Sequence, residues 1–303
     1  MIENKKAGHG LALLTELMWG FTFISTKVLL EGFQAIEVLF LRFAIAFIIL
    51  FLFYPKRMKR MSVRQELMFA AAGLFGVCLY FLLENIALTY TMASNVGVIV
   101  AVAPFFTAIV GRFFDPTGEK NHKSFYIGFV VAMCGIFLIS FNGAELHLSP
   151  KGDLLALLAA LTWAFYSNCI KKIGTYGCDT ICVTRRVFFY GLILMLPALI
   201  LMDFSPDWQR MISQPKYIGN LLFLGCGASA LGFVTWNLAV RIIGAVRTSV
   251  YIYLGPIITV TASAVILKEP ITIISACGTI LTLVGLILSE SPSFLSGRKH
   301  PKG

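Results

Sequence analysis

The sequence has few charged residues and lacks the motifs of most enzyme classes. Only 13% of its 303 residues are charged and 58% are hydrophobic, with a mean hydropathy of +0.83, whereas soluble domains carry about 25% charged residues. It contains no GxxxxGK[ST] phosphate loop, no CxxC and no Cys/His metal spacing. Its four histidines, which fall in expected tails and loops, are His9, His122, His147 and His300. We therefore expect no enzyme activity, no direct use of ATP, no metal and no cofactor.

The apolar residues form long runs separated by short polar connections. Each run is about 20 residues long, which is the length of a helix that crosses a bilayer, and the alternation of barrel strands is scarce. Little chain is left for a soluble domain, so the function must lie within the membrane. The pattern predicts an all-α integral membrane protein with ten transmembrane helices, over residues 10–30, 35–54, 67–89, 94–114, 124–142, 152–172, 180–202, 217–240, 248–267 and 272–290.

The net charge of +10 is distributed unevenly along the chain. Basic residues gather in connections that would share one side, above all in the run KRMKR at 56–60. The positive-inside rule makes this side cytoplasmic, and an even number of spans places both termini there. We expect a multi-pass protein of the cell (plasma or inner) membrane, surrounded by lipid, with no nucleic-acid partner. Monomer and homodimer both stay open.

The two halves of the sequence repeat each other. ELMWGFTFISTK at 16–27 resembles ALTWAFYSNCIK at 160–171. Further matching pairs follow in the same order: Arg42 and Arg186, Asn85 and Asn237, and Pro104 and Pro256. The pattern predicts two five-helix repeats, residues 1–146 and 147–303. Because five is odd, the second repeat is inverted in the membrane, which is typical of transporters. Duplication kept only for packing is the alternative.

Two acidic residues lie within predicted spans, where a charge costs about 2.5–3.5 kcal/mol at the helix centre. Glu16 shares a helix face with Trp19, and Glu84 shares one with Tyr80. A carboxyl group beside aromatic rings can carry a proton or bind an ammonium group, so Glu16 and Glu84 are candidates for proton coupling. The alternative is a structural carboxyl that bonds the backbone or extends to the interface.

Aromatic and amide side chains inside the spans are candidates for lining a cavity. An interior Trp needs a partner for its N–H group, and a pocket wall offers one. For each single residue, hydrogen bonding between packed helices is the alternative. The candidate substrate-binding residues are Trp19, Tyr80, Asn85, Asn95, Trp163, Tyr166, Trp236, Asn237 and Tyr251.

Other residues in the spans shape the helices in this interpretation. Pro104 and Pro256 fall at matching places inside two spans, where proline bends a helix, and we interpret them as hinges beside a central site. Arg42 and Arg186 are assigned structural roles at helix C-termini or lipid phosphates, and a role in a gate is the alternative. Pairs of glycines two turns apart let the fifth and tenth spans approach closely as scaffold helices: Gly128 with Gly135, and Gly278 with Gly285.

The order of these features resembles the EamA-like family of the drug/metabolite transporter superfamily. The similar segments are LRFAIAF around Arg42, AxxYTMAS at 87–94, AVRIIGAV at 239–246, YLGPI around Pro256, and KEP at 268–270. The resemblance covers nearly the whole chain. It implies a central cavity bounded by spans one, three, four, six, eight and nine. The first repeat departs from the family where it has DPTGEK at 115–120.

The resemblance also implies secondary-active transport of a small-molecule substrate. We expect export of amino acids or related small metabolites by alternating access through the central cavity. An importer or an uncoupled facilitator of drug-like, nucleoside or sugar solutes is one alternative, and a non-transporting membrane receptor is another. Replacing Glu16 by Gln separates coupled from uncoupled transport, because only a coupled transporter needs a titratable group.

Overall fold

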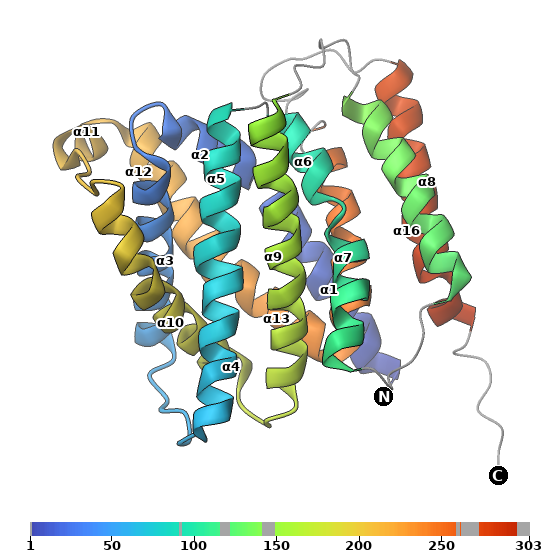
Figure 1. Ribbon diagram of the computed structural model, residues 1–303, viewed down its shortest axis with the longest axis horizontal. Helices are drawn as coiled ribbons and strands as arrows, with labels where there is room; N and C mark the ends of the chain where they lie inside the picture. The colour runs from blue at the N-terminus through green and yellow to red at the C-terminus, as the bar shows by residue number, and fades with distance from the viewer. Residues whose placement is uncertain are drawn as a thin grey trace.

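The computed structural model describes residues 2–90, 93–115, 122–140, 149–258, 261 and 273–295, and in these ranges every regular element is a helix (Figure 1). The KEP segment at 268–270 lies outside them. The all-helical fold class is thereby confirmed. Up to residue 140 the elements are α1 (Ile2–Trp19), α2 (Thr22–Leu30), α3 (Ala35–Phe53), α4 (Val63–Gly73), η1 (Leu74–Leu79), α5 (Tyr80–Tyr90), α6 (Ala93–Val100), α7 (Ala103–Phe114) and α8 (Lys123–Ser140). The later elements are α9 (Pro150–Gly174), α10 (Thr180–Leu201), α11 (Trp208–Ser213), α12 (Pro215–Leu222), η2 (Phe223–Leu231), α13 (Gly232–Ile243), α14 (Ala245–Val250), η3 (Tyr251–Tyr253) and α16 (Ile273–Leu295).

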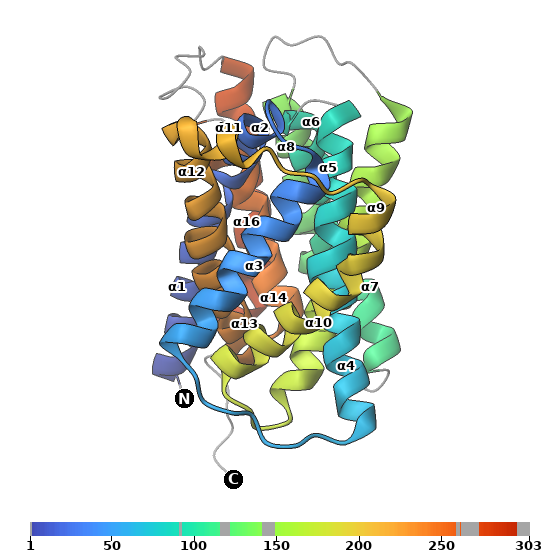
Figure 2. The ribbon, with the colours of Figure 1, turned by 90° about the vertical axis from the view of Figure 1, so that its left-hand side faces the viewer.

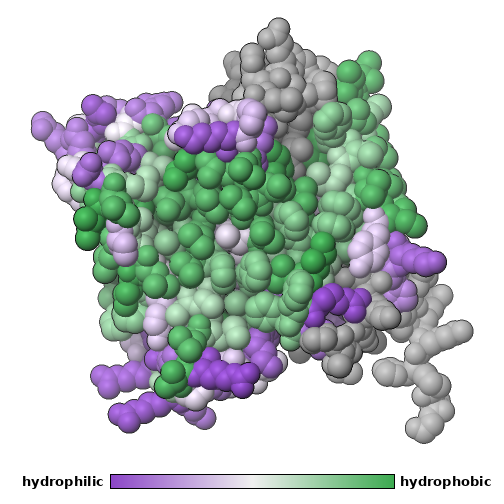
Figure 3. Space-filling view, viewed as in Figure 1, coloured by the Kyte–Doolittle hydropathy of each residue, from purple (hydrophilic) through white to green (hydrophobic). Residues whose placement is uncertain are grey.

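Many of these helices suit a bilayer. Within the described residues, six helical runs are long and apolar enough to cross a membrane: Lys5–Leu30, Ala35–Phe53, Val63–Tyr90, Pro150–Gly174, Thr180–Leu201 and Pro215–Ile243. Shorter apolar helices cover Ala103–Phe114, Lys123–Leu138, Ala245–Ile258 and Ala276–Ser289. Figure 3 shows a broad hydrophobic band with hydrophilic side chains gathered above and below it. This surface is that of a multi-pass membrane protein, with apolar side chains facing lipid.

The helices of the two halves of the chain pack on one another in matching pairs. α1 packs against α13, and α5 packs against α9. Likewise α3 packs against η2, and α10 packs against η1. The last long helices of the two halves, α8 and α16, lie side by side at one edge of the molecule (Figure 1). The core of the bundle is therefore built from both halves.

Glycines allow the close approach of α8 and α16. A Cβ atom on Gly135 would lie 2.5 Å from the backbone nitrogen of Thr282 and 2.6 Å from the carbonyl oxygen of Gly278. A Cβ on Gly285 would lie 2.4 Å from the backbone nitrogen of Ala132. Backbone atoms cannot turn aside, so these positions accept no side chain without moving a helix. The close packing that the glycine spacing predicts is present.

Two membrane helices contain a π-helical segment at corresponding places. η1 separates α4 from α5, and η2 separates α12 from α13. A π-helix widens the turn and shifts the hydrogen-bond register, and such segments often occur at functional sites. The side chains that follow η1 and η2 thus take directions that a regular helix would not give them.

The helices that contain the matched prolines are also irregular. A turn at residues 101–102 separates α6 from α7, and Pro104 lies in the first turn of α7. The 3₁₀ turn η3 comes before Pro256, which lies in the helical residues 254–258. Proline has no N–H group and its ring clashes with the preceding turn, which accounts for both interruptions.

Candidate functional site

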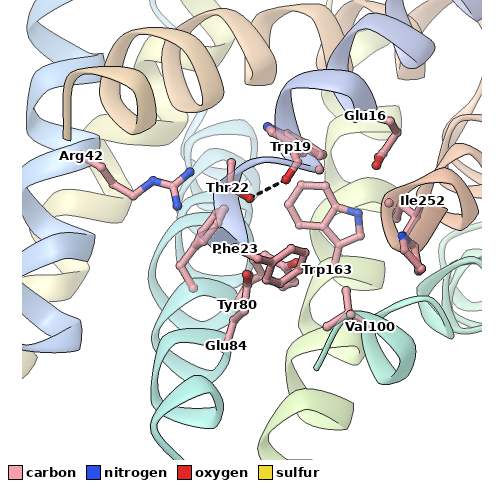
Figure 4. A pocket seen from close by; sticks show the side chains of 15 residues that line it. Glu16, Trp19, Thr22, Phe23, Arg42, Tyr80, Glu84, Val100, Trp163 and Ile252 are labelled. Carbon is pink, nitrogen blue, oxygen red and sulfur yellow. Dashed lines mark hydrogen bonds between the residues drawn. The ribbon is translucent and has the colours of Figure 1, made fainter. Parts of the chain in front are cut away.

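A pocket lies inside the bundle between helices of both halves of the chain (Figure 4). Its volume is about 600 Å³, including the part open to solvent. The break between α1 and α2 forms part of its wall, where the Thr22 hydroxyl donates to the carbonyl oxygen of Trp19 at 2.7 Å. The lining residues are Glu16, Trp19, Gly20, Thr22, Phe23, Arg42, Tyr80, Phe81, Glu84, Gly97, Val100, Trp163, Ile252, Gly255 and Pro256.

Both intramembrane acids line this pocket. Glu16, on α1, is 3% exposed, and Glu84, on α5, is 6% exposed. Glu16 Oε1 and Glu84 Oε2 are buried and have no hydrogen-bond partner. Glu84 interacts with the Tyr80 side chain one turn away, whereas the Glu16 carboxylate lies near Gly255. Buried carboxylate oxygens without partners are costly, so both groups are suited to receive a proton or a cationic ligand.

Arg42 brings a positive charge into the same pocket. It is 1% exposed, its Nε donates to Ser229 Oγ at 2.9 Å, and its guanidinium carbon lies 4.4 Å from the Phe81 ring centroid. Its Nη2 has no hydrogen-bond partner. The charge is close enough to act electrostatically on Glu84. A pocket enclosed by apolar helices therefore contains charged groups of both signs.

Three tryptophans form one aromatic cluster beside the pocket. The Trp19 ring centroid lies 5.2 Å from that of Trp163 and 5.0 Å from that of Trp236. Trp19 and Trp163 line the pocket, while Trp236 is fully buried behind them. Trp19 Nε1 donates to the carbonyl oxygen of Ala228 at 2.8 Å, but Nε1 of Trp163 and Nε1 of Trp236 have no partner.

Other predicted site residues lie outside the lining of this pocket. The Tyr166 hydroxyl donates to Asn237 Oδ1 at 2.6 Å, and Asn237 Nδ2 donates to Thr184 Oγ1 at 2.9 Å. These bonds link α9, α13 and α10, as expected of polar groups that hold membrane helices together. Asn85 Nδ2 donates to the carbonyl oxygen of Ala35 at 3.3 Å.

The remaining predictions fall in different places. The Tyr251 hydroxyl is hydrogen-bonded to His9 Nδ1 at 2.7 Å, joining η3 to α1. Pro256 lines the pocket, whereas Pro104 is buried in α7 and is not among the lining residues. Asn95 lies in α6, but its side chain is outside the described part of the structure.

Sequence reasoning missed several lining residues, above all Arg42. A charged residue inside the apolar run LRFAIAF costs as much in a membrane as Glu16 does, and this signal alone could have identified it. The other missed side chains carry no such signal, because apolar residues, and a threonine that bonds the nearby helix backbone, face lipid, core and pocket alike. They are Thr22, Phe23, Phe81, Val100 and Ile252.

These features define a multi-pass helical membrane protein with a pocket in its interior that is lined by charged and aromatic side chains. The chain belongs to the EamA-like transporter family, whose family model matches it twice, at residues 6–141 and 150–290. The sequence resemblance to this family is thereby confirmed.

Relatives over nearly the whole length carry transporter names. A protein of Archaeoglobus fulgidus, named an uncharacterized transporter, is 27% identical over 93% of this chain and 97% of its own. A probable amino-acid metabolite efflux pump of Escherichia coli is 26% identical over 92% and 93%. A probable terminal-alkyne amino-acid exporter of Streptantibioticus cattleyicolor is 23% identical over 91% of both chains. One solved crystal structure has the same fold, with a TM-score of 0.74 at 18% identity over 97% of this chain and 98% of that one.

Proposed function

We propose that this protein is a secondary-active transporter that exports amino acids or related small metabolites from the cell. Ten membrane helices would form two inverted repeats, residues 1–146 and 147–303, in the plasma or inner membrane. The observation that carries the proposal is the pocket itself, because both halves of the chain line it and it contains three buried charged side chains. Charges inside a membrane bundle mark solute or ion pathways.

The packing of the helices supports the inverted repeat. The pairs α1 with α13 and α9 with α5 correspond to each other, as do α3 with η2 and α10 with η1. The two separate matches of the family model support the same division. The names of two relatives, an amino-acid metabolite efflux pump and an amino-acid exporter, support the substrate class.

Alternating access requires a closed side, and buried polar contacts between the two halves support one, because the contacts at the other end, Lys151 with Tyr90 and Lys216 with Glu31, are exposed. Thr15 and Thr235 share a hydrogen bond of 2.6 Å, and Asn168 Nδ2 donates to the carbonyl oxygen of Thr107 at 3.1 Å. In α1 and α9 these contacts lie nearer than the pocket to the end of the bundle where α1 begins (Figure 1). We infer that the pocket is closed toward this end, and that breaking these contacts would open it there. Pro104 and Pro256 would serve as hinges.

Glu16 is the candidate for the coupling proton. Its carboxylate lies in the pocket, and no cationic group in the described residues forms an ion pair with it. A carboxylate in an apolar bundle is stable only when a proton or a cation neutralises it. Proton binding from one side and release to the other would then couple transport to the proton gradient.

The test is uptake and counterflow of labelled amino acids in proteoliposomes, with and without an imposed pH gradient. Wild-type protein should accumulate the solute when the gradient is present. Glu16→Gln cannot titrate, so we expect accumulation to fall by at least about 10-fold while exchange at equal concentrations continues. The control Glu31→Gln, at an exposed residue paired with Lys216, should behave as wild type.

Two results would contradict parts of this proposal. If the wild type exchanges solute without any response to the pH gradient, the protein is an uncoupled facilitator and Glu16 has a structural role. Absence of movement for every amino acid, nucleoside and sugar tested would reject the transport function.

A further inference from the structure

We propose that Arg42 binds the carboxylate of the transported solute, so that the pocket selects zwitterions with a free carboxylate and an ammonium group. This inference rests on the proposed function and assigns a specificity role to a residue for which the sequence predicts a structural role at a helix end or a lipid phosphate, with a role in a gate as the alternative. Three observations support it: the orphaned donor on Arg42, the contrast with Arg186, and the arrangement of charges across the pocket.

The guanidinium of Arg42 is held in place but not satisfied. Ser229 accepts a hydrogen bond from Nε, and the Phe81 ring lies 4.4 Å from the guanidinium carbon. These contacts fix the plane of the group, yet Nη2 is buried in the pocket wall without a partner. A planar fork of N–H donors matches a carboxylate in two parallel hydrogen bonds. An arginine that is oriented and left unpaired is therefore prepared for an incoming carboxylate.

The matching arginine of the second repeat has an acidic partner in the protein, although its Nη1, like Nη2 of Arg42, makes no hydrogen bond. Arg186, on α10, forms an ion pair of 3.0 Å with Glu66 on α4, and it does not line the pocket. For Arg42, the described part of the chain contains no acid within ion-pair distance, although Glu84 acts on it electrostatically. If packing were the only role of this repeated arginine, Arg42 would be expected to have a protein carboxylate as Arg186 does.

Two charged side chains of the pocket, Arg42 and Glu16, lie on opposite sides of aromatic rings. In Figure 4, Arg42 lies on one side of Trp19 and Trp163, and Glu16 lies on the other. A zwitterion could place its carboxylate at Arg42 and direct its ammonium group toward a carboxylate, with its side chain against the rings. Glu84 would balance the charge of Arg42 when the pocket is empty. A solute without a carboxylate would leave the guanidinium unpaired, and this is the physical basis of selection.

The test compares matched pairs of ligands that differ only in the carboxylate. The probes are L-phenylalanine, L-leucine and L-lysine, each against its carboxamide, and the readout is the ligand-dependent thermal shift of the full-length protein in detergent. At least one acid should bind the wild type about 10-fold or more tightly than its amide. Arg42→Gln should reduce this preference to within about 2-fold, whereas Arg186→Gln should retain it.

Further variants keep the test decisive if Arg42→Gln does not fold. Arg42→Lys retains the charge but loses the fork, so the acid should bind about 10-fold more weakly and the amide unchanged. Ser229→Ala removes the hydrogen-bond acceptor of Arg42 Nε, and it should weaken binding of the acid more than binding of the amide. The inference would be overturned if the wild type bound acid and amide equally, or bound no acid at all. It would also be overturned if the preference for the acid survived in Arg42→Gln or in both milder variants.

The failure of this inference can be told apart from failure of the proposed function. An acid preference that depends on Arg42, without movement of the same acid in proteoliposomes, would support the binding role and reject transport. If amino acids and their carboxamides are transported equally well, the result would support transport and reject the role of Arg42.

Discussion

Two tryptophans in similar sequence segments of the two halves, Trp19 and Trp163, use their indole N–H groups differently, which predicts different effects when each is replaced. Trp19→Phe removes a donor that bonds the carbonyl oxygen of Ala228, so we expect the free energy of unfolding to fall by about 1 kcal/mol. Trp163→Phe removes a donor that has no protein partner and faces the pocket. It should lower stability only through the smaller ring, without the loss of a hydrogen bond, and lower the affinity for substrate several-fold. Thermal unfolding and competition in counterflow measure the two effects. Equal effects of both variants on both measurements would contradict this division.

At the scale of residues, the sequence identifies pocket residues best where the side chain is energetically unfavourable inside a membrane. Glu16, Glu84, Trp19 and Trp163 stand out because a charge or an indole donor in a membrane needs a reason, and all four line the pocket. The amides and phenols at Asn85, Tyr166, Asn237 and Tyr251 stand out equally, but their bonds go to other helices. Sequence cannot separate these cases, because a hydrogen bond to a neighbouring helix and one to a substrate require the same residue types.

At the scale of elements, the close contact of α8 with α16 predicts a strong effect of a single methyl group. Gly135→Ala would place its Cβ 2.5 Å from the backbone of Thr282, so the helices must separate. We expect a loss of about 1–3 kcal/mol in the free energy of unfolding, as in other overpacked sites. Gly10→Ala on α1 is the matched control, because nothing lies within 4 Å of its Cβ, and better helix propensity should leave stability unchanged or slightly higher. Thermal unfolding in detergent measures both, and an unchanged Gly135→Ala melting temperature would refute the tight contact.

The helices themselves follow from hydrophobic runs, but their irregular segments do not. The interruptions before Pro104 and Pro256 have a covalent cause that is visible in the sequence. The π-helical segments η1 and η2 contain no proline; η1 packs against α10, and η2 packs against α3. Neither periodicity nor composition encodes a π-helical segment, so these segments were found only in the structure.

At the scale of the whole molecule, the charge distribution predicts which end of the bundle faces the cytoplasm. The basic connection that contains Lys59 lies at the end where α1 begins, and α11 lies at the opposite end (Figure 2). Basic residues are retained on the cytoplasmic side, where anionic lipids attract them.

In a background without the native cysteines, Lys59→Cys and Gln209→Cys provide exposed reporters for the two ends. In intact cells, a membrane-impermeant maleimide should label position 209 and not position 59, and permeabilisation should expose both. The opposite labelling would place the termini outside, and equal labelling in intact cells would mean that the two positions share one side and that the proposed topology is wrong. The expected result would also place the closed end of the pocket at the cytoplasm, so that the state described here is the one that releases an exported solute to the outside.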